Sequence, residues 1–420
     1  MNITKRDVLE LRRRLTKNGC SFTRMAGCYV GGNQNRIVQF AQPFLGLADE
    51  EFHKYLEIAR KVISGTPGGN LLELSLRADA DADACRSLLL ALRDSGLKND
   101  GLLERFYEQV IAHYQCAGNY LILLFHDIYD VPVRAEDHAK LDESEEVYTY
   151  LLCAICPVEL SKPGLGYLET ENRFGPRIRD WVVGLPEIGF LYPAFSDRSS
   201  DLSAIMYYVK PGKNSQPELV QEVLGCSAQR TAAEEKQAFQ SIVKEAFGTE
   251  QEQAQSALLH IQKNLHELVA TRDEDGLPPI ELTAAGVRDV LSDVEIPTTA
   301  KEQIAQTYEA TFHDTLPYAQ NLVDSKLVQA GIEREATLAL THKIASLEQQ
   351  LANKEHSALS ASSPSADDLP WDSSAPQIVL QVPTEKASRI QTQVIDGQKC
   401  LVIPVDDGES ARINGVAESF

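Results

Sequence analysis

Two dense apolar runs, at residues 119–126 and 147–155, place the strongest constraint on how this chain folds. Each run is short, rich in aliphatic and aromatic side chains and bounded by turn-forming residues, a pattern typical of buried strands. Further strands are predicted at residues 180–183, 189–194 and 204–209. Because turns or short loops separate several of these runs, we expect a largely antiparallel sheet with helices on one face.

The chain before these runs predicts helices and strands together. Thr4 and Asp7 have the spacing of a capping box, which opens a helix that Gly19 ends. Strands at residues 24–30 and 36–40 are joined by a glycine-rich stretch that favours a hairpin. Further helices are predicted at residues 48–63, 82–95 and 100–114.

The second half of the chain is predicted to be mainly helical. Apolar residues recur at helical spacing in the segments 234–247, 250–271, 283–292, 298–313 and 333–351. In the last segment the apolar residues keep a 4-3-4 spacing over about two heptads: Leu340, Ile344, Leu347 and Leu351. Two heptads are too few to predict a coiled coil, so we expect these residues to pack on the body of the protein. A coiled coil with another helix is the alternative.

These patterns predict an α+β protein, because 420 residues exceed one ordinary hydrophobic core. We expect an α/β body with a mostly antiparallel sheet over residues 1–230 and a helical region over 231–356. A segment rich in Ser, Ala, Asp and Pro predicts a flexible linker over 357–375. A small β-hairpin module is expected over 376–420, where Asp396-Gly397 separates two apolar runs.

The charge of the chain limits its partners. A formal net charge of −21 repels phosphate backbones, so nucleic acid is not an expected partner. Six cations in the first helix stand apart from this balance: Lys5, Arg6, Arg12, Arg13, Arg14 and Lys17. They fit a solvated helix face or a clamp on the protein's own acidic body, and a small anion or RNA is the alternative.

The remaining bulk features predict a cytoplasmic protein without a membrane segment. The first residues open into a charged helix rather than an apolar run, so we expect no signal peptide. The apolar stretches are too short or too interrupted to cross a bilayer. Eight scattered cysteines favour reduced thiols over a disulfide framework.

Two polar clusters follow strand ends and supply the candidate ligand-binding residues. His126, Asp127 and Asp130 come directly after one strand, and Asp197 and Arg198 follow another. Such groups can bind a metal or form an acid/base pair, and the two clusters can meet in space. The alternatives are a hydrogen-bonded loop and a self-paired turn. No catalytic residue, metal-ligand set or cofactor is assigned.

Two further patterns favour structural explanations. Cys153 and Cys156 have the spacing of a redox or metal pair, but they lie inside an apolar run and no second pair accompanies them. Residues three apart on a strand face opposite sides, so we expect structural cysteines. Arg173, Arg177 and Arg179 lie near a tryptophan, where salt bridges to the acidic protein explain them and an anion site is the alternative.

Longer strings carry more information than any of these motifs. The strings are GCYV (27–30), LLALRDSGL (89–97), GNYLILLFHDIYDVP (118–132), CAICP (153–157), DWVVGLPEIGFLYPAFSD (180–197) and IDGQKCLVIP (395–404). They resemble a bacterial family catalogued as domain of unknown function 4317, over the whole chain and least at 333–374. The resemblance implies a bacterial cytoplasmic protein and a shared architecture. It supplies no catalytic residue, because the family has no established activity.

Two hypotheses for function follow. The first is a non-enzymatic binding or regulatory protein whose partner is another protein or a second copy of itself; no small molecule is identified. The second is a hydrolase or metal-dependent enzyme with a site at His126, Asp127, Asp130 and Asp197.

Overall fold

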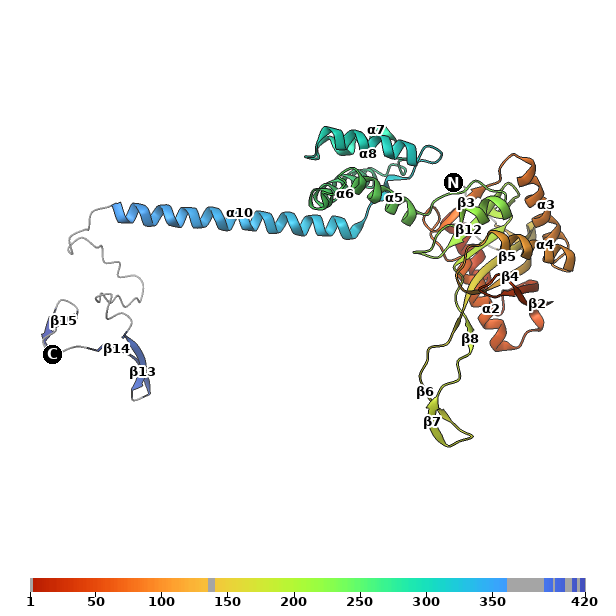
Figure 1. Cartoon of the computed structure of the whole chain (residues 1–420), viewed down its shortest axis with the longest axis horizontal. Helices are drawn as coiled ribbons and strands as arrows, with labels where there is room; N and C mark the ends of the chain where they lie inside the picture. Colours follow the sequence, from red (N-terminus) through yellow and green to blue (C-terminus); the bar gives the residue numbers. More distant parts are fainter. Residues whose placement is uncertain are drawn as a thin grey trace. The chain divides into compact units, whose positions relative to one another are not determined.

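The computed structural model describes residues 3–134, 140–360, 389–395, 397–404, 410–413 and 416–419 (Figure 1). The side chains of residues 133–145 and 352–360 and those beyond 404 lie outside this description. The chain divides into two compact units, Met1–Leu340 and Thr341–Phe420. Helices and a large antiparallel sheet together confirm the predicted α+β class.

The first unit is built on a sheet of eight strands that all pair antiparallel. Its order is β2 (Arg36–Pro43), β1 (Phe22–Val30), β4 (Asn119–Arg134), β5 (Lys140–Leu160), β9 (Ile188–Tyr192), β12 (Ala204–Val209) and β3 (Leu71–Ser75). The eighth strand, β8 (Trp181–Val183), pairs with β5 beyond the end of β9.

Helices cover both faces of this sheet. One hydrophobic core lies under α1 (Lys5–Arg14), η1 (Phe44–Gly46) and α2 (Asp49–Val62). The other lies under α3 (Ala80–Asp94), α4 (Asp100–His113) and η2 (Leu219–Val223). The prediction of helices on one face is therefore wrong. Its signal was present, because β9 and β12 are apolar at every position, as strands buried on both faces are.

The helical region has a core of its own. It contains α5 (Ala232–Glu245), α6 (Gln251–Glu274), α7 (Ala284–Ser292), α8 (Thr298–Thr311) and the short α9 (Ala319–Leu322). Hydrogen bonds to Gly68 and Gly69 join it to the sheet body. The Ala232 amide donates to the Gly69 carbonyl at 3.0 Å, and the Asn321 side chain donates to the Gly68 carbonyl at 3.4 Å.

The final helix, α10 (Ser325–Ser360), differs from its prediction. Its apolar residues at Leu340, Ile344, Leu347 and Leu351 are all exposed. They lie at and beyond the boundary of the two units, and their packing on the body stays a prediction. Beyond it, β13 (Gln391–Ile395) and β14 (Gln398–Val402) form the predicted hairpin, followed by β15 (Ser410–Ile413) and β16 (Val416–Ser419). Residues 361–375 of the predicted linker lie outside the described residues, so the domain boundaries stay predictions.

Two small ribbons lie outside the main sheet. One pairs β6 (Leu165–Leu168) with β7 (Arg173–Pro176), and the other pairs β10 (Ala194–Ser196) with β11 (Ser199–Asp201).

Of the helices in the described part of the chain, none has both the length and the apolar composition needed to span a membrane.

Gly189 allows α2 to approach the sheet. A Cβ built at this position would lie 2.6 Å from Val62 Cγ2 on α2 and 2.7 Å from the Cys153 carbonyl oxygen on β5. Both distances are well inside van der Waals contact, so a larger residue here would push the helix and two strands apart.

We predict that Gly189→Ala lowers the free energy of unfolding by about 1–3 kcal/mol, because an added methyl group overpacks this contact. Gly118→Ala is the matched control, since a Cβ there meets nothing within 4 Å. Urea denaturation followed by circular dichroism measures both. Equal transition midpoints for the two variants would contradict the role assigned to Gly189.

Candidate functional site

Asp127 is a fully buried carboxylate surrounded by donors. Its side chain, on β4, is 0% exposed. It accepts hydrogen bonds from Ser21 Oγ at 2.7 Å and Tyr150 Oη at 2.6 Å, and Arg14 Nη1 lies 3.2 Å from its Oδ2. Tyr150 is its direct cross-strand partner on β5. The charge of Asp127 is thus matched inside the protein.

The same network reaches Arg198. The Arg14 guanidinium stacks over the Tyr129 ring, 3.7 Å from its centroid, and Tyr129 Oη donates to Glu10 Oε1 at 2.9 Å. Arg198 Nε lies 3.2 Å from Glu10 Oε2. Burial, with Glu10 beside it, raises the pKa of Tyr129 to about 12. Five residues therefore form a continuous chain from Asp127 to Arg198 that ties α1 to β4 and to the turn between β10 and β11.

Arg198 enters this network from a two-residue hairpin turn. Asp197 and Arg198 connect β10 to β11 with φ values of 46° and 61°, so both central residues are left-handed, as in a type I′ turn. Non-glycine residues adopt this conformation at a cost, and the contacts of Arg198 help to hold it. Its Nη2 donates to the Pro132 carbonyl at 2.6 Å. Asp197 is exposed at the turn.

His126 lies on the opposite face of the sheet from Asp127. Its Nδ1 is hydrogen-bonded to Thr23 Oγ1 at 2.6 Å, and its ring lies close to Gly96 at the end of α3. Burial lowers the pKa of His126. Asp130, on the same face, is exposed. The structure thus joins Asp127 and Arg198 and separates the other three predicted residues, and ligand binding at any of the five stays a prediction.

The arrangement at Asp127 leaves little room for metal or acid/base chemistry. The described residues contain no group of three or more His, Cys, Asp or Glu side chains placed to hold a metal ion.

Arg14 was visible in the sequence as part of the basic first helix, where a clamp on the acidic body was one interpretation. The pairs Arg14–Asp127 at 3.2 Å and Lys17–Asp49 at 2.8 Å agree with that interpretation.

We predict that Asp127→Asn lowers the free energy of unfolding by about 2–4 kcal/mol, because it leaves the mostly buried Arg14 without its counter-charge. Asp130→Asn, an isosteric change at an exposed position of the same strand, should stay within about 0.5 kcal/mol of wild type. Guanidinium denaturation at pH 7 compares the two variants. A stable, fully folded Asp127→Asn protein would contradict the structural role of this carboxylate.

The two cysteines at CxxC spacing also face opposite sides of the sheet. Cys153 belongs to the core under α3 and α4, and Cys156 to the core under α1 and α2. Burial raises the pKa of both thiols, which keeps them protonated and unreactive. All eight cysteines are free thiols. The sequence-based interpretation of Cys153 and Cys156 as structural residues agrees with this geometry.

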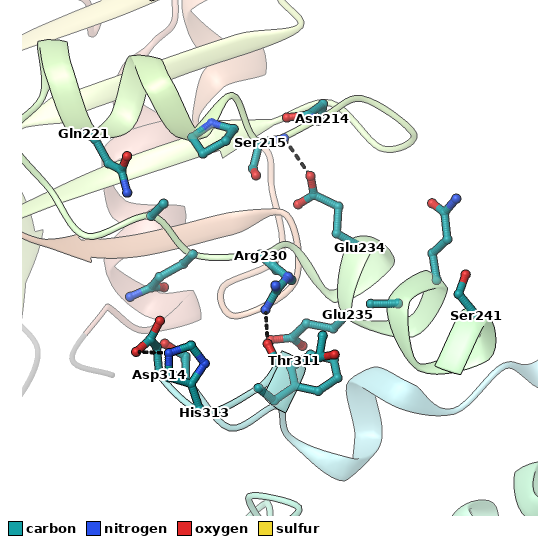
Figure 2. Close-up of a pocket in the computed structure, with 17 residues that line it drawn as sticks. Asn214, Ser215, Gln221, Arg230, Glu234, Glu235, Ser241, Thr311, His313 and Asp314 are labelled. Carbon is teal, nitrogen blue, oxygen red and sulfur yellow. Dashed lines mark hydrogen bonds and ion pairs between the residues drawn. The ribbon is translucent and has the colours of Figure 1, made fainter. Parts of the chain in front are cut away.

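A polar pocket of about 580 Å³ lies where the helical region meets the sheet body (Figure 2). Figure 2 shows Glu234 hydrogen-bonded to the Ser215 amide, at 2.8 Å, and Arg230 bonded to the Thr311 carbonyl, at 3.0 Å. These bonds connect the start of α5 to the segment before it and to the end of α8. The pocket is therefore part of the joint between the two regions.

Glu235 is the unusual residue of this joint. It is 8% exposed and points inward with Phe239, one helical turn further along α5. Asn321 Nδ2 donates to Glu235 Oε2 at 2.8 Å and also to the Gly68 carbonyl of the sheet body. Burial raises the pKa of Glu235 to about 7, against the opposing effects of Asn321 and Arg230. A charged residue at a core position of the helical pattern was the signal that the sequence analysis missed.

We predict that Glu235 makes the protein less stable as the pH rises. Its folded pKa of about 7 exceeds the ordinary value of 4.5, so the folded state binds more protons between these pH values. The contribution of the protonated Glu235 to the free energy of unfolding is therefore fully present below pH 4.5 and is lost as the pH rises through 7. Glu235→Gln keeps the hydrogen-bond acceptor and should be about 1–3 kcal/mol more stable than wild type at pH 8. Thermal melts at pH 5 and pH 8 measure the difference.

The matched control for this prediction is Glu245→Gln, at an exposed position of the same helix. It should change the free energy of unfolding by less than about 0.5 kcal/mol at either pH. A Glu235→Gln protein that gains no stability between pH 5 and pH 8 relative to wild type would show that the carboxyl is not strained by burial.

A third feature is a β-ribbon, residues 161–180, that stands away from the sheet between β5 and β8 and contains β6 and β7 (Figure 1). We call it the arm. Hydrogen bonds continue the β5–β8 ladder into it: the Ser161 amide donates to the Asp180 carbonyl at 2.8 Å, and the Arg177 amide to the Gly164 carbonyl at 2.9 Å. The arm is thus a continuation of the sheet beyond the covering helices.

One face of the arm is apolar and uncovered. Leu165, Tyr167 and Phe174 share this face, because Tyr167 pairs directly with Phe174 and Leu165 lies two residues earlier. They are 79%, 53% and 74% exposed, and the Tyr167 and Phe174 ring centroids lie 5.7 Å apart. Ile178, further along the arm, is 77% exposed. This is a contiguous apolar surface of the kind that marks interaction sites.

The predicted basic patch lies on this arm, and its cations are held locally. Arg173 forms an ion pair with Glu171 at 2.5 Å, and Arg179 Nε donates to the Ser161 carbonyl at 2.7 Å. The Arg173 pair agrees with the salt bridges expected from the sequence. The arm itself supplies both partners.

The model of a family described as Domain of unknown function (DUF4317) matches residues 1–416, which confirms the resemblance found in the sequence. A search of curated proteins finds none that matches.

Proposed function

The chain belongs to the family described as Domain of unknown function (DUF4317), and from that premise we propose that it is a binding protein that acts through its arm rather than an enzyme. The observation that carries this proposal is the uncovered apolar face of Leu165, Tyr167 and Phe174. The proposed partner is another protein.

The energetics of exposure support a partner. Full burial of a Leu, Ile or Phe side chain contributes about 1.5–3 kcal/mol, and the arm forgoes most of this at several positions. A ribbon of two strands has no core of its own to stabilise it. The hydrogen-bonded root at Ser161 and Gly164 presents the apolar face in a defined orientation, which reduces the entropy lost on binding.

The alternative of a hydrolase or metal-dependent enzyme receives less support. It requires His126 and Asp127 to act together, and these side chains face opposite cores. It also requires a carboxylate available to substrate, whereas Asp127 already bonds Arg14, Ser21 and Tyr150. A general acid or base must reach its substrate proton within hydrogen-bonding distance.

The test uses the double substitution Phe174→Ser with Ile178→Ser on the arm. Its control is Ile37→Ser with Val38→Ser, which removes two half-exposed apolar side chains from β2. Tagged forms of both variants and of wild type are used to capture proteins from a lysate of the source cells. We expect the arm variant to capture one of these proteins in an amount at least about tenfold lower than wild type does. A tenfold loss of affinity corresponds to only about 1.4 kcal/mol of binding free energy.

The control variant should retain that protein at the wild-type level, and both variants should keep the wild-type melting temperature. An arm variant that captures the same proteins in the same amounts as wild type would overturn the proposed function.

A further inference from the structure

The base of the arm borders an apolar groove on the same unit. The groove, of about 630 Å³, lies between α2 and β8 and is floored by Tyr55, Ile58, Leu121, Val182, Val183 and Leu185. Strand β8 pairs with β5 along one edge, and its other edge has no strand partner in the described part of the chain. Trp181 and Val182 of β8 are half exposed. The groove therefore combines an apolar floor with a free sheet edge.

The charges around the groove complement those of the arm. Glu50 and Glu51, in the first turn of α2, line the rim, and neither makes an ion pair within the described residues. The third rim carboxylate, Glu57, is paired with Lys54 at 3.3 Å. On the arm, Lys162 and Arg177 are exposed cations, again without an ion pair in the described ranges. Two unpaired carboxylates thus match two unpaired cations.

We propose that the occupant of the groove is the arm of a second copy of this chain, and that the two copies exchange arms around a two-fold axis. This inference rests on the proposed function, because it names the partner that the arm binds. The arm begins at the edge of the groove, so a two-fold axis that sets the two arms antiparallel would bring each arm to the groove of the other copy. A self-complementary surface of this kind forms a closed dimer.

The apolar area of the arm is a large part of what a stable dimer needs. Five exposed apolar side chains follow one another from arm to base: Leu165, Tyr167, Phe174, Ile178 and Trp181. At roughly 100 Å² each they contribute on the order of 500 Å² from one copy, and the groove adds to this. The total approaches the roughly 800 Å² per partner of a standard interface. Such a dimer would bury the arm and the groove, both of which are exposed in a single chain.

The charge pattern allows a sharp test with two variants. The arm variant is Lys162→Glu with Arg177→Glu, and the groove variant is Glu50→Lys with Glu51→Lys. Light scattering after gel filtration, at about 100 µM protein, should give wild type a mass twice the 46.4 kDa of one chain. Each variant alone should be monomeric, because its arms and grooves carry like charges and dimerisation weakens by about a hundredfold or more.

An equimolar mixture of the two variants should recover the dimer. In the mixed pair the anionic arm meets a cationic groove, and the cationic arm meets an anionic groove, so both contacts become attractive again. The four substitutions combined in one chain should also recover it. This recovery separates a contact between copies from a loss of folding, which the melting temperature of each variant monitors.

A monomeric wild type, a dimeric arm variant or a mixture that stays monomeric would each overturn the proposal. The fate of the proposed function is read separately. A monomeric wild type whose arm still captures a different protein keeps the binding function and loses the second copy as partner. A monomeric wild type without arm-dependent capture loses both.

Discussion

Consecutive residues of a strand face opposite sides of a sheet, and in this protein helices cover both sides. Neighbours in the sequence therefore lie in different cores. His126 and Asp127 are adjacent in the sequence. His126 is hydrogen-bonded to Thr23 on the α3 side of the sheet, whereas Asp127 is paired with Arg14 of α1 on the other side. Cys153 and Cys156 are divided in the same way. This constraint places the members of both motifs in different surroundings.

The two buried carboxylates illustrate how the surroundings decide the state of a charge. Asp127 is fully buried, but a guanidinium, a hydroxyl and a phenol compensate its charge. Glu235 is nearly as buried and has one amide donor, Asn321, so its pKa rises to about 7. The first carboxylate is therefore a fixed part of the fold. The second makes the joint between the sheet body and the helical region sensitive to pH.

Side chains also alternate between the two faces of the arm, but helices do not cover these faces in the described part of the chain. Its two strands continue the ladder of β5 and β8, but past the end of the body no helix among the described residues covers them, and the apolar residues that alternation gathers on one face stay exposed. Within a sheet such a face becomes core. On the arm it stays exposed, and the apolar groove beside β8 lies at the base of the arm.

Local patterns in the sequence were enough to determine most strands and helices, the antiparallel sheet, the hairpin of β13 and β14 and the opposite directions of Cys153 and Cys156, because these depend on periodicity and turn chemistry. The covering of both sheet faces and the contact of Arg14 with Asp127, 113 residues away, were decided by the tertiary structure. So were the joining of Arg198 to this network and the burial of Glu235. These features depend on strand order and helix packing, which bring distant residues together and leave no local periodicity in the sequence.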